Sequence, residues 1–154
     1  VTREYYQRPR ATEAAKIEDG DTFWHRMGDL GWQDRTGRIW FCGRKSHRVV
    51  TKTGTLFTIP CEAIFNNHPR VFRSALVGLG PKGQQRPVIC IELEPDDGGS
   101  DKKGLKKELL EMAKGSPITE SIETILFHRA FPVDIRHNSK IFREKLAVWA
   151  EKKI

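Results

Sequence analysis

Residues Met27–Gly54 read MGDLGWQDRTGRIWFCGRKSHRVVTKTG, and this order of turn, aromatic and basic residues predicts two consecutive β-hairpins. The first hairpin turns at Asp34–Gly37, where glycine supplies the positive φ that other residues resist. Ile39–Cys42 then forms a strand of the residue types that pack well in a sheet. The second hairpin spans Val49–Phe57 and turns at Lys52–Thr55.

The link between the hairpins, Gly43–Ser46, allows two arrangements. Both hairpins can belong to one sheet, or they can belong to two domains that meet at the link. We favour two domains, because from Ser46 onward the predicted elements make an α+β set of their own, a β-hairpin plus a three-stranded sheet with flanking helices. We therefore expect a β-rich end of one domain over residues 1–45 and a small α+β domain over 46–154.

The second domain alternates helix and strand patterns. Proline suits the first turn of a short helix over Pro60–Phe65, and Glu62 near its start is favourable helix-dipole chemistry. Ser100 is placed to cap the lysine-rich helix that follows the loop 94–100. The other predicted elements are strands over Val71–Leu79, Val88–Leu93 and Ile125–Phe127, an irregular polar loop over Phe131–Ser139, and an amphipathic helix from Lys140 to about Lys152.

Composition narrows the class of protein. The 154 residues carry a formal net charge of +7, which favours phosphate-bearing partners without identifying them. The three cysteines and five histidines have no disulfide or metal-ligand spacing, so we predict no metal site. No apolar run approaches a membrane span and no signal peptide is evident, which favours a cytoplasmic location. The chain begins without Met, and we interpret it as a piece of a longer protein.

Two residues of the first hairpin are candidates for binding a nucleotide. Asp29 lies between two glycines, and an acidic group on a tight backbone can accept hydrogen bonds from a ribose diol; otherwise it is a turn aspartate bonded to its own backbone. Arg44 can present a guanidinium fork to a phosphate or ribose, or it is a solvated basic turn residue. Asp34 is assigned to the turn itself.

Lys140 is the candidate catalytic residue. At the predicted start of a helix a lysine is electrostatically misplaced, because the helix N-terminus is already positive. Either Lys140 reaches a neighbouring phosphate site, or it is a surface lysine beside Arg143 and Glu144. Gly54, on local evidence, is a turn glycine.

Other classes of function also fit these patterns. Aromatic side chains amid basic residues permit a nucleic-acid-binding module that stacks bases on a sheet. The aromatic residues concerned are Trp24, Trp32, Trp40, Phe41 and Phe57. They fall on both strand parities, so some of them must be core, which argues against this function. A third possibility is a chain that only docks partner proteins.

Three blocks, in the right order and spacing, resemble the carboxy-terminal part of the AMP-forming, adenylate-forming ligases. This superfamily includes acyl-CoA synthetases, luciferases and peptide-synthetase adenylation domains. Residues 28–45 resemble its pattern of Gly-Asp, then Asp-x-x-Gly, then Gly-Arg. Residues 58–71 resemble Pro-x-Glu-Ile-Glu followed by His-Pro-x-Val, and residues 138–146 resemble Ser-Gly-Lys-Ile-x-Arg-x-x-Leu. The resemblance covers almost the whole chain.

The resemblance implies a role for each candidate. Asp29 would bind the ribose hydroxyls of ATP, Arg44 would lie near ribose and phosphate, Ser46 would be the interdomain hinge, and Lys140 would be the adenylation lysine. The implied cofactors are ATP and Mg²⁺. The implied fold is a small mobile carboxy-terminal domain, preceded by the end of the larger adenylation domain that is its partner.

Three departures from the family pattern argue against transfer of the acyl group to CoA. Ser46 replaces the usual Asp or Lys, Thr51–Gly54 replaces a glycine-rich turn near the pantetheine path, and Ser139 replaces a glycine. Gly54 therefore has the weakest assignment, a possible part in a second half-reaction.

The end of the chain, FPVDIRHNSKIFREKLAVWA, is similar to the β-lactone synthetases of bacterial long-chain olefin biosynthesis. Their implied reaction activates a 2-alkyl-3-hydroxy fatty acid with ATP and closes a β-lactone, releasing AMP and pyrophosphate. The alternatives are a long-chain fatty acyl-CoA synthetase or a fatty acyl-AMP ligase. Implied partners are the fatty acid substrate and other olefin-biosynthesis enzymes, with no nucleic acid. The phosphate loop and acyl pocket of the family are absent, so we expect this chain alone to be inactive.

Overall fold

The computed structural model describes residues 2–98 and 101–154, except for the side chains of residues 137–139. The fold is mixed α+β, and the chain divides into two compact units, Val1–Ser46 and His47–Ile154. We refer to them as unit 1 and unit 2. Within the described residues, no helix has the length and apolar character needed to cross a lipid bilayer.

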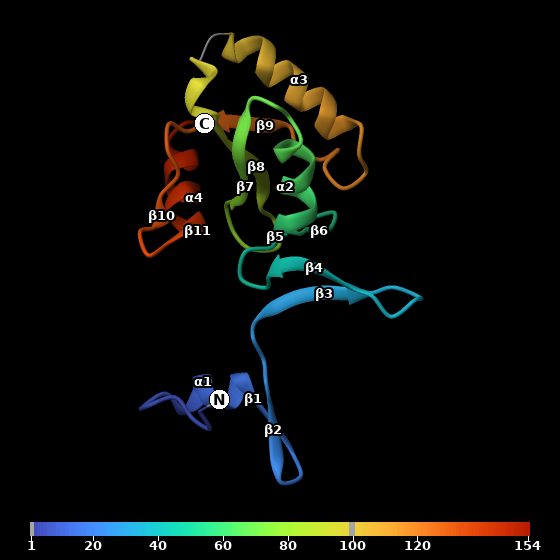
Figure 1. Ribbon diagram of the computed structural model, residues 1–154, viewed down its shortest axis with the longest axis vertical. Helices are drawn as coiled ribbons and strands as arrows, with labels where there is room; N and C mark the ends of the chain where they lie inside the picture. Colours follow the sequence, from blue (N-terminus) through green and yellow to red (C-terminus); the bar gives the residue numbers. More distant parts are fainter. Residues whose placement is uncertain (1, 99–100) are drawn as a thin grey trace. The chain divides into compact units, whose positions relative to one another are not determined.

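Unit 1 holds one short helix and two antiparallel hairpins (Figure 1). Its elements are α1 (Pro9–Ala15), β1 (Lys16–Asp19), β2 (Thr22–His25), β3 (Asp29–Gln33) and β4 (Ile39–Arg44). The predicted turn at Asp34–Gly37 is confirmed: Gly37 has φ +84°, and its N–H donates to the Asp34 carbonyl at 3.0 Å. The first hairpin therefore has the form that the sequence predicts.

The aromatic side chains of the hairpin β3–β4 are exposed to solvent. Trp32, Trp40 and Phe41 are each about half exposed, and the rings of Trp32 and Trp40 stack with centroids 5.9 Å apart. A two-stranded hairpin has no second layer to cover its faces. Within this chain the expectation that some of the five aromatics are core therefore fails for Trp24, Trp32, Trp40 and Phe41, whereas Phe57 in unit 2 is partly buried.

The described part of unit 2 contains two small hairpins, a three-stranded sheet and three α-helices. One hairpin pairs β5 (Val49–Val50) with β6 (Thr55–Leu56), and the other pairs β10 (Val133–Asp134) with β11 (His137–Ile141). The sheet has the order β7 (Val71–Leu79), β8 (Arg86–Leu93), β9 (Thr124–Phe127). Strands β7 and β8 are antiparallel, whereas β8 and β9 are parallel and need a crossover, which contains α3. The remaining elements are α2 (Thr58–Asn66), η1 (Pro95–Asp97), α3 (Lys102–Lys114) and α4 (Arg143–Glu151).

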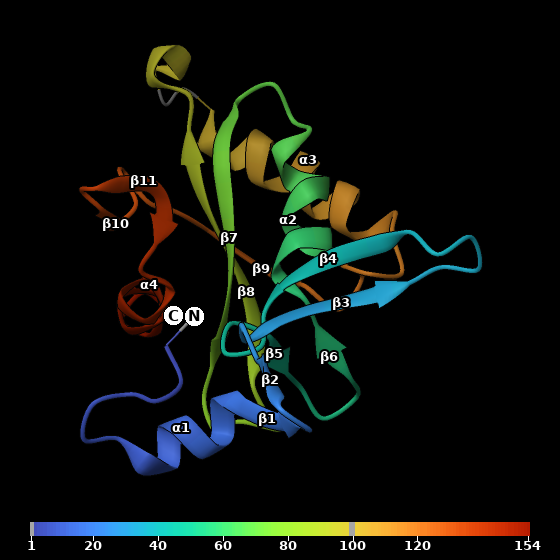
Figure 2. The same ribbon diagram turned by 60° about the horizontal axis from the view of Figure 1, so that its bottom comes forward.

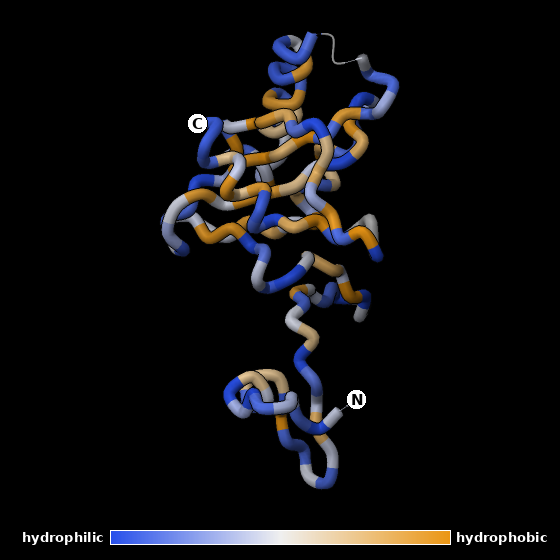
Figure 3. Tube along the Cα trace, turned by 90° about the vertical axis from the view of Figure 1, so that its left-hand side faces the viewer, coloured by the Kyte–Doolittle hydropathy of each residue, from blue (hydrophilic) through white to orange (hydrophobic). Residues whose placement is uncertain are grey.

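The sheet of unit 2 separates two hydrophobic cores. Helices α2 and α3 cover one face, and α4 covers the other (Figures 1 and 2). Along β8, Ile89 and Ile91 pack toward α2 and α3, while Val88 and Cys90 pack toward α4. This alternation is what a strand buried on both faces requires. In Figure 3 the hydrophobic colour accordingly runs along the strands of this unit.

The start of α3 differs in detail from the prediction. Ser100, the predicted cap, lies outside the described residues. Asp101 caps the helix, since its side chain accepts a hydrogen bond from the Gly104 N–H at 2.9 Å. Asp101 has φ +47°, a left-handed conformation that Asp tolerates better than most residues.

The predicted start of the last helix at Lys140 is wrong. Helix α4 begins at Arg143, and Lys140 lies on β11, which pairs with β10 through Val133 and Ile141. The N–H of Phe142 donates to the Pro132 carbonyl at 2.8 Å, which keeps the chain extended as far as Phe142. Part of the predicted irregular loop is therefore a hairpin, and the helix-dipole argument for Lys140 no longer holds.

Candidate functional site

Asp29 and Arg44 face each other across β3 and β4 in unit 1. Arg44 Nε lies 3.1 Å from Asp29 Oδ1, and Arg44 Nη1 donates to the Met27 carbonyl at 2.5 Å. A register shift between Leu30 and Gly31 accompanies the pairing, and a Cβ at Gly31 would approach the Trp40 carbonyl oxygen to 2.8 Å. The hairpin thus brings together two candidates that lie 15 positions apart in the sequence.

The Asp29–Arg44 ion pair remains accessible to solvent. The side chain of Asp29 is 38% exposed and that of Arg44 is 51% exposed. Exposed pairs of this kind stabilise a fold by only about 0–1 kcal/mol. The carboxylate uses one oxygen toward Arg44, and within the described residues its second oxygen has no protein partner, so it can accept hydrogen bonds from hydroxyl groups.

Asp34 has the structural role that the sequence predicts. Its Oδ1 accepts from the backbone N–H groups of Thr36 and Arg38, at 2.9 and 3.0 Å. Its Oδ2 accepts from Trp40 Nε1 at 3.0 Å and from Arg38 Nε at 2.7 Å. These bonds, led by those from Trp40 and Thr36, lower the pKa of Asp34 well below its usual range. Asp34 is therefore committed to the turn.

Ser46 is the last residue of unit 1, and its side chain is exposed. The preceding backbone is tied to the hairpin, because the Lys45 N–H donates to the Gly28 carbonyl at 2.8 Å. The hinge role of Ser46 stays a prediction.

Gly54 lies between β5 and β6 in unit 2. Thr51 holds this turn: its N–H and hydroxyl both donate to the Gly54 carbonyl, at 2.8 and 2.9 Å. A Cβ built on Gly54 meets no atom within 4 Å, and its φ is not in the left-handed region. Gly54 is a turn residue, but nothing in the described structure requires glycine there.

Lys140, on β11 of unit 2, has an exposed side chain. Among the residues that the structure describes, no carboxylate pairs with its ammonium group. The nearby Asp134 is engaged by Arg136, whose guanidinium donates to both carboxylate oxygens at 3.2 and 3.1 Å. Hydrogen bonds from Arg136, followed by the charge of Lys140, lower the pKa of Asp134. The ammonium group of Lys140 can therefore interact with a ligand.

The sequence did not point to a buried ion pair between Glu62 on α2 and Arg143 at the start of α4. Arg143 donates through Nη1 to Oε1 and through Nη2 to Oε2 of Glu62, the second bond at 2.9 Å. Burial raises the pKa of Glu62, while Arg143 and the N–H of Leu76 act in the opposite direction. The available signals were a glutamate in the apolar segment 61–65 and an arginine three residues after Lys140.

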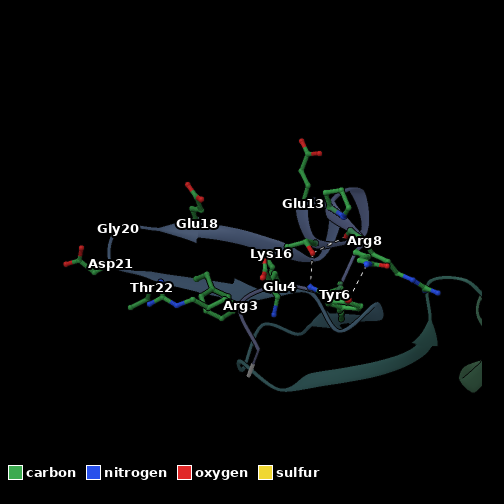
Figure 4. A pocket seen from close by; sticks show the side chains of 15 residues that line it. Arg3, Glu4, Tyr6, Arg8, Glu13, Lys16, Glu18, Gly20, Asp21 and Thr22 are labelled. Atoms are coloured by element: carbon green, nitrogen blue, oxygen red, sulfur yellow. Dashed lines mark hydrogen bonds between the residues drawn. The ribbon is translucent and has the colours of Figure 1, made fainter.

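A hollow of about 760 Å³ lies in unit 1, between the start of the chain and the hairpin β1–β2 (Figure 4). Polar and aromatic side chains line it, among them Arg3, Tyr6, Arg8 and Lys16. None of the five predicted site residues lines this hollow. No group of three or more His, Cys, Asp or Glu side chains suited to a metal ion lies in the described part of the chain.

Comparisons of the sequence with known proteins give two strong similarities. No family model matches the sequence. Olefin β-lactone synthetases from Xanthomonas campestris pv. campestris and Stenotrophomonas maltophilia are each 50% identical over 155 residues, which is 97% of this chain and 28% of each relative. A 4-chlorobenzoate–CoA ligase from Arthrobacter is 40% identical over 93 residues, 59% of this chain and 17% of the ligase. The chain thus spans little more than a quarter of the length of the first two relatives.

Solved structures agree on the fold. The amide bond synthetase McbA from Marinactinospora thermotolerans matches with a TM-score of 0.74 and 20% identity, over 95% of this chain and 28% of McbA. The o-succinylbenzoate CoA synthetase MenE from Bacillus subtilis, in complex with ATP and magnesium ion, matches with a TM-score of 0.71 and 22% identity, over 95% of this chain and 28% of MenE. At this identity the match describes the fold alone.

Proposed function

This chain belongs to the AMP-forming, adenylate-forming ligases, where it aligns with their carboxy-terminal part, and from this we infer that the whole protein is an ATP-dependent β-lactone synthetase. The observation that carries the proposal is 50% identity to two olefin β-lactone synthetases over 97% of this chain. Because the chain spans only 28% of those relatives, the reaction, the substrate and the partner domain are all proposed for the whole protein.

Lys140 would assist the first half of the reaction, in which the carboxylate of a 2-alkyl-3-hydroxy fatty acid attacks the α-phosphate of ATP. The carboxylate enters this step negatively charged, and further negative charge builds up on the α-phosphate oxygens and on the departing pyrophosphate. A lysine held between the carboxylate and the α-phosphate acts by electrostatic stabilisation. No ion pair among the described residues holds the ammonium group of Lys140, although its charge acts on nearby Asp134. This supports the role, because the exposed ammonium group stays accessible to a ligand.

Asp29 and Arg44 would bind the nucleotide. The second carboxylate oxygen of Asp29 suits the ribose hydroxyls, and Arg44 can contact ribose or phosphate while it holds Asp29 in place. Mg²⁺, when bound with ATP, would offset the charge of the departing pyrophosphate. The described residues contain no cluster that could hold this ion by itself, so we assign it no protein ligand here.

The second half of the reaction would need no CoA. The oxygen of the substrate's own 3-hydroxyl attacks the activated carbonyl, the bond from the carbonyl carbon to the AMP oxygen breaks, and the hydroxyl proton is released. Two groups on one molecule react with a high effective concentration. The products are a β-lactone and AMP.

Unit 2 would act as a mobile lid that carries Lys140 to the adenylation site, with Ser46 as the hinge. The division of the chain between Ser46 and His47 supports this proposal. Unit 1 would then be the end of the larger adenylation domain, and that domain would be the main partner of unit 2. Hinge motions of this kind are a common way to complete an active site.

The proposed reaction is tested by incubating the full-length protein with a 2-alkyl-3-hydroxy fatty acid and ATP, with and without CoA. Mass spectrometry of the products should detect a β-lactone and AMP in both reactions. A CoA thioester in place of the β-lactone in the reaction with CoA would instead assign the protein to the acyl-CoA synthetases. The similarity to a 4-chlorobenzoate–CoA ligase makes this the second candidate function. If the protein forms no β-lactone, no CoA thioester and no AMP, the proposal is overturned.

A further inference from the structure

A buried ion pair joins two layers of unit 2 close to Lys140. Arg143 is the first residue of α4, three positions after Lys140, and both of its terminal nitrogens donate to the carboxylate of Glu62 on α2. The side chains of Glu62 and Arg143 are 8% and 14% exposed. Such a pair is bidentate, so it fixes direction as well as distance.

The same pair satisfies the backbone at the open edge of the sheet. Strand β7 lies at the edge of the order β7-β8-β9. On this strand, the N–H of Leu76 donates to Glu62 Oε1 at 2.7 Å, and the carbonyl oxygen of Leu76 accepts from Arg143 Nη1 at 3.3 Å. Because α2 and α4 cover opposite faces of the sheet, the pair spans this edge and holds both helices to one residue of β7.

The segment that carries Lys140 is thereby anchored at both ends. At its start, the Phe131 N–H donates to Glu92 Oε2 on β8 at 2.7 Å. At its end, Arg143 is held by Glu62, and between these points the Phe142 N–H bonds to the Pro132 carbonyl. Lys140 stands one residue before Ile141, which pairs with Val133. Its backbone is therefore set by contacts to α2, β7 and β8.

We propose that Glu62 and Arg143 are positioning residues, which act through Lys140 by fixing the strand β11 on the body of unit 2. The inference rests on the proposed adenylation role of Lys140. Electrostatic stabilisation of a transition state depends on a charge that is already in place, and a displacement of about 1 Å can lower a rate about 100-fold. An anchored strand supplies that placement for a long and otherwise flexible side chain.

The test uses Glu62→Gln in the full-length enzyme. An amide at this position removes the charge and cannot accept from Arg143 through both atoms. Pyrophosphate release should fall about 10- to 100-fold in kcat, with KM for ATP and acid within about two-fold. Hydrogen exchange should also become faster in peptides that cover residues 138–143, while peptides from β8 keep their protection.

Asp97→Asn is the matched control, because it breaks another partly buried bidentate pair of unit 2. Arg70, which precedes β7, donates through Nε and Nη2 to Asp97 of η1, at 2.5 and 3.1 Å. This variant should lower Tm without changing kcat at temperatures well below Tm. If Glu62→Gln proves too unstable to study, Arg143→Lys keeps the positive charge but loses the fork and should show a smaller kcat loss of the same kind.

A double variant separates positioning from direct chemistry. Adding Glu62→Gln to Lys140→Ala should change the residual rate by less than about two-fold, because both substitutions remove the same contribution, the placed charge of Lys140. The positioning role is overturned if Glu62→Gln and Arg143→Lys keep the parental kcat, or if their losses add fully to that of Lys140→Ala. Normal pyrophosphate release by Lys140→Ala itself would instead overturn the adenylation role of Lys140 on which this inference rests, whatever Glu62 does.

Discussion

Asp29 and Asp34 lie five positions apart on one hairpin, yet their carboxylates have different surroundings. Asp34 receives hydrogen bonds on both oxygens from Thr36, Arg38 and Trp40. Asp29 is held at one oxygen by Arg44 and stays partly exposed. The structural role of Asp34 was predicted correctly from the sequence, because Asp-x-x-Gly is a recognisable turn pattern. The ribose-binding role of Asp29 stays a proposal.

Replacement of Asp34 by Asn should destabilise the β3–β4 hairpin in a pH-dependent way. Folding lowers the pKa of Asp34, so its carboxylate stabilises the folded state at pH values above its unfolded-state pKa of about 3.9. This stabilisation is lost as the pH falls toward the lower folded-state pKa. Denaturant unfolding, followed by fluorescence of the stacked Trp32 and Trp40, should show a difference between the parent chain and Asp34→Asn at pH 7 that shrinks below about pH 4. A difference that instead disappears between pH 5 and 7 would contradict this assignment.

At the scale of elements, local patterns predicted the hairpin β3–β4, helix α2 and the three strands of the sheet. Each has a strong local signal, such as the turn glycine Gly37 or the continuous apolar run of β8. The hairpin β10–β11 was missed because its strands are short and polar. Ile141 and Phe142 also share helical spacing with Leu146 and Trp149. The pairing of Val133 with Ile141 and the bond from the Phe142 N–H to the Pro132 carbonyl decide against a helix there.

The Glu62–Arg143 pair could not be predicted from local sequence, since its partners are 81 residues apart. Helix-dipole chemistry accounted for Glu62 equally well at the sequence level. What distinguishes it is burial next to Leu76 at the edge of β7, which depends on the packing of α2 and α4 on the same sheet.

The cap of α3 gives a stability prediction for unit 2. Replacing Asp101 by Ala removes the bond to the Gly104 N–H and places alanine at φ +47°, so the free energy of unfolding should fall by about 1–3 kcal/mol. Asn keeps an acceptor and tolerates this conformation, so Asp101→Asn should stay within about 0.5 kcal/mol of the parent. Urea denaturation of the three proteins measures both values, and equal losses for Ala and Asn would contradict the capping role.

At the scale of the whole molecule, the exposed aromatics of unit 1 fit a chain that spans 28% of its relatives. A hairpin with aromatic residues on uncovered faces is a typical site of contact with other protein surface. We expect the proposed adenylation domain of the whole protein to cover these faces. The similarity to ligases does not favour the nucleic-acid explanation of the same aromatics.

This chain by itself should have no ligase activity. The chain spans only 28% of its olefin β-lactone synthetase relatives, and we expect the phosphate loop and acyl pocket of the family to lie outside it. Incubation of the isolated chain with ATP, Mg²⁺ and a 3-hydroxy fatty acid should give no acyl adenylate by mass spectrometry. The full-length protein in the same assay serves as the positive control, and acyl adenylate formed by the isolated chain would contradict the domain assignment.

The role of Lys140 is the central claim, and pyrophosphate release by Lys140→Ala in the full-length enzyme tests it most directly. Loss of a preorganised charge of this kind typically costs about 100- to 1,000-fold in rate. We predict a kcat loss of at least that size, with ATP binding by calorimetry within about three-fold of the parent, since a group that acts mainly in the transition state contributes little to ground-state binding. Lys145→Ala, which removes an exposed lysine of α4, is the control and should release pyrophosphate normally. Pyrophosphate release by Lys140→Ala at the parental rate would contradict the account.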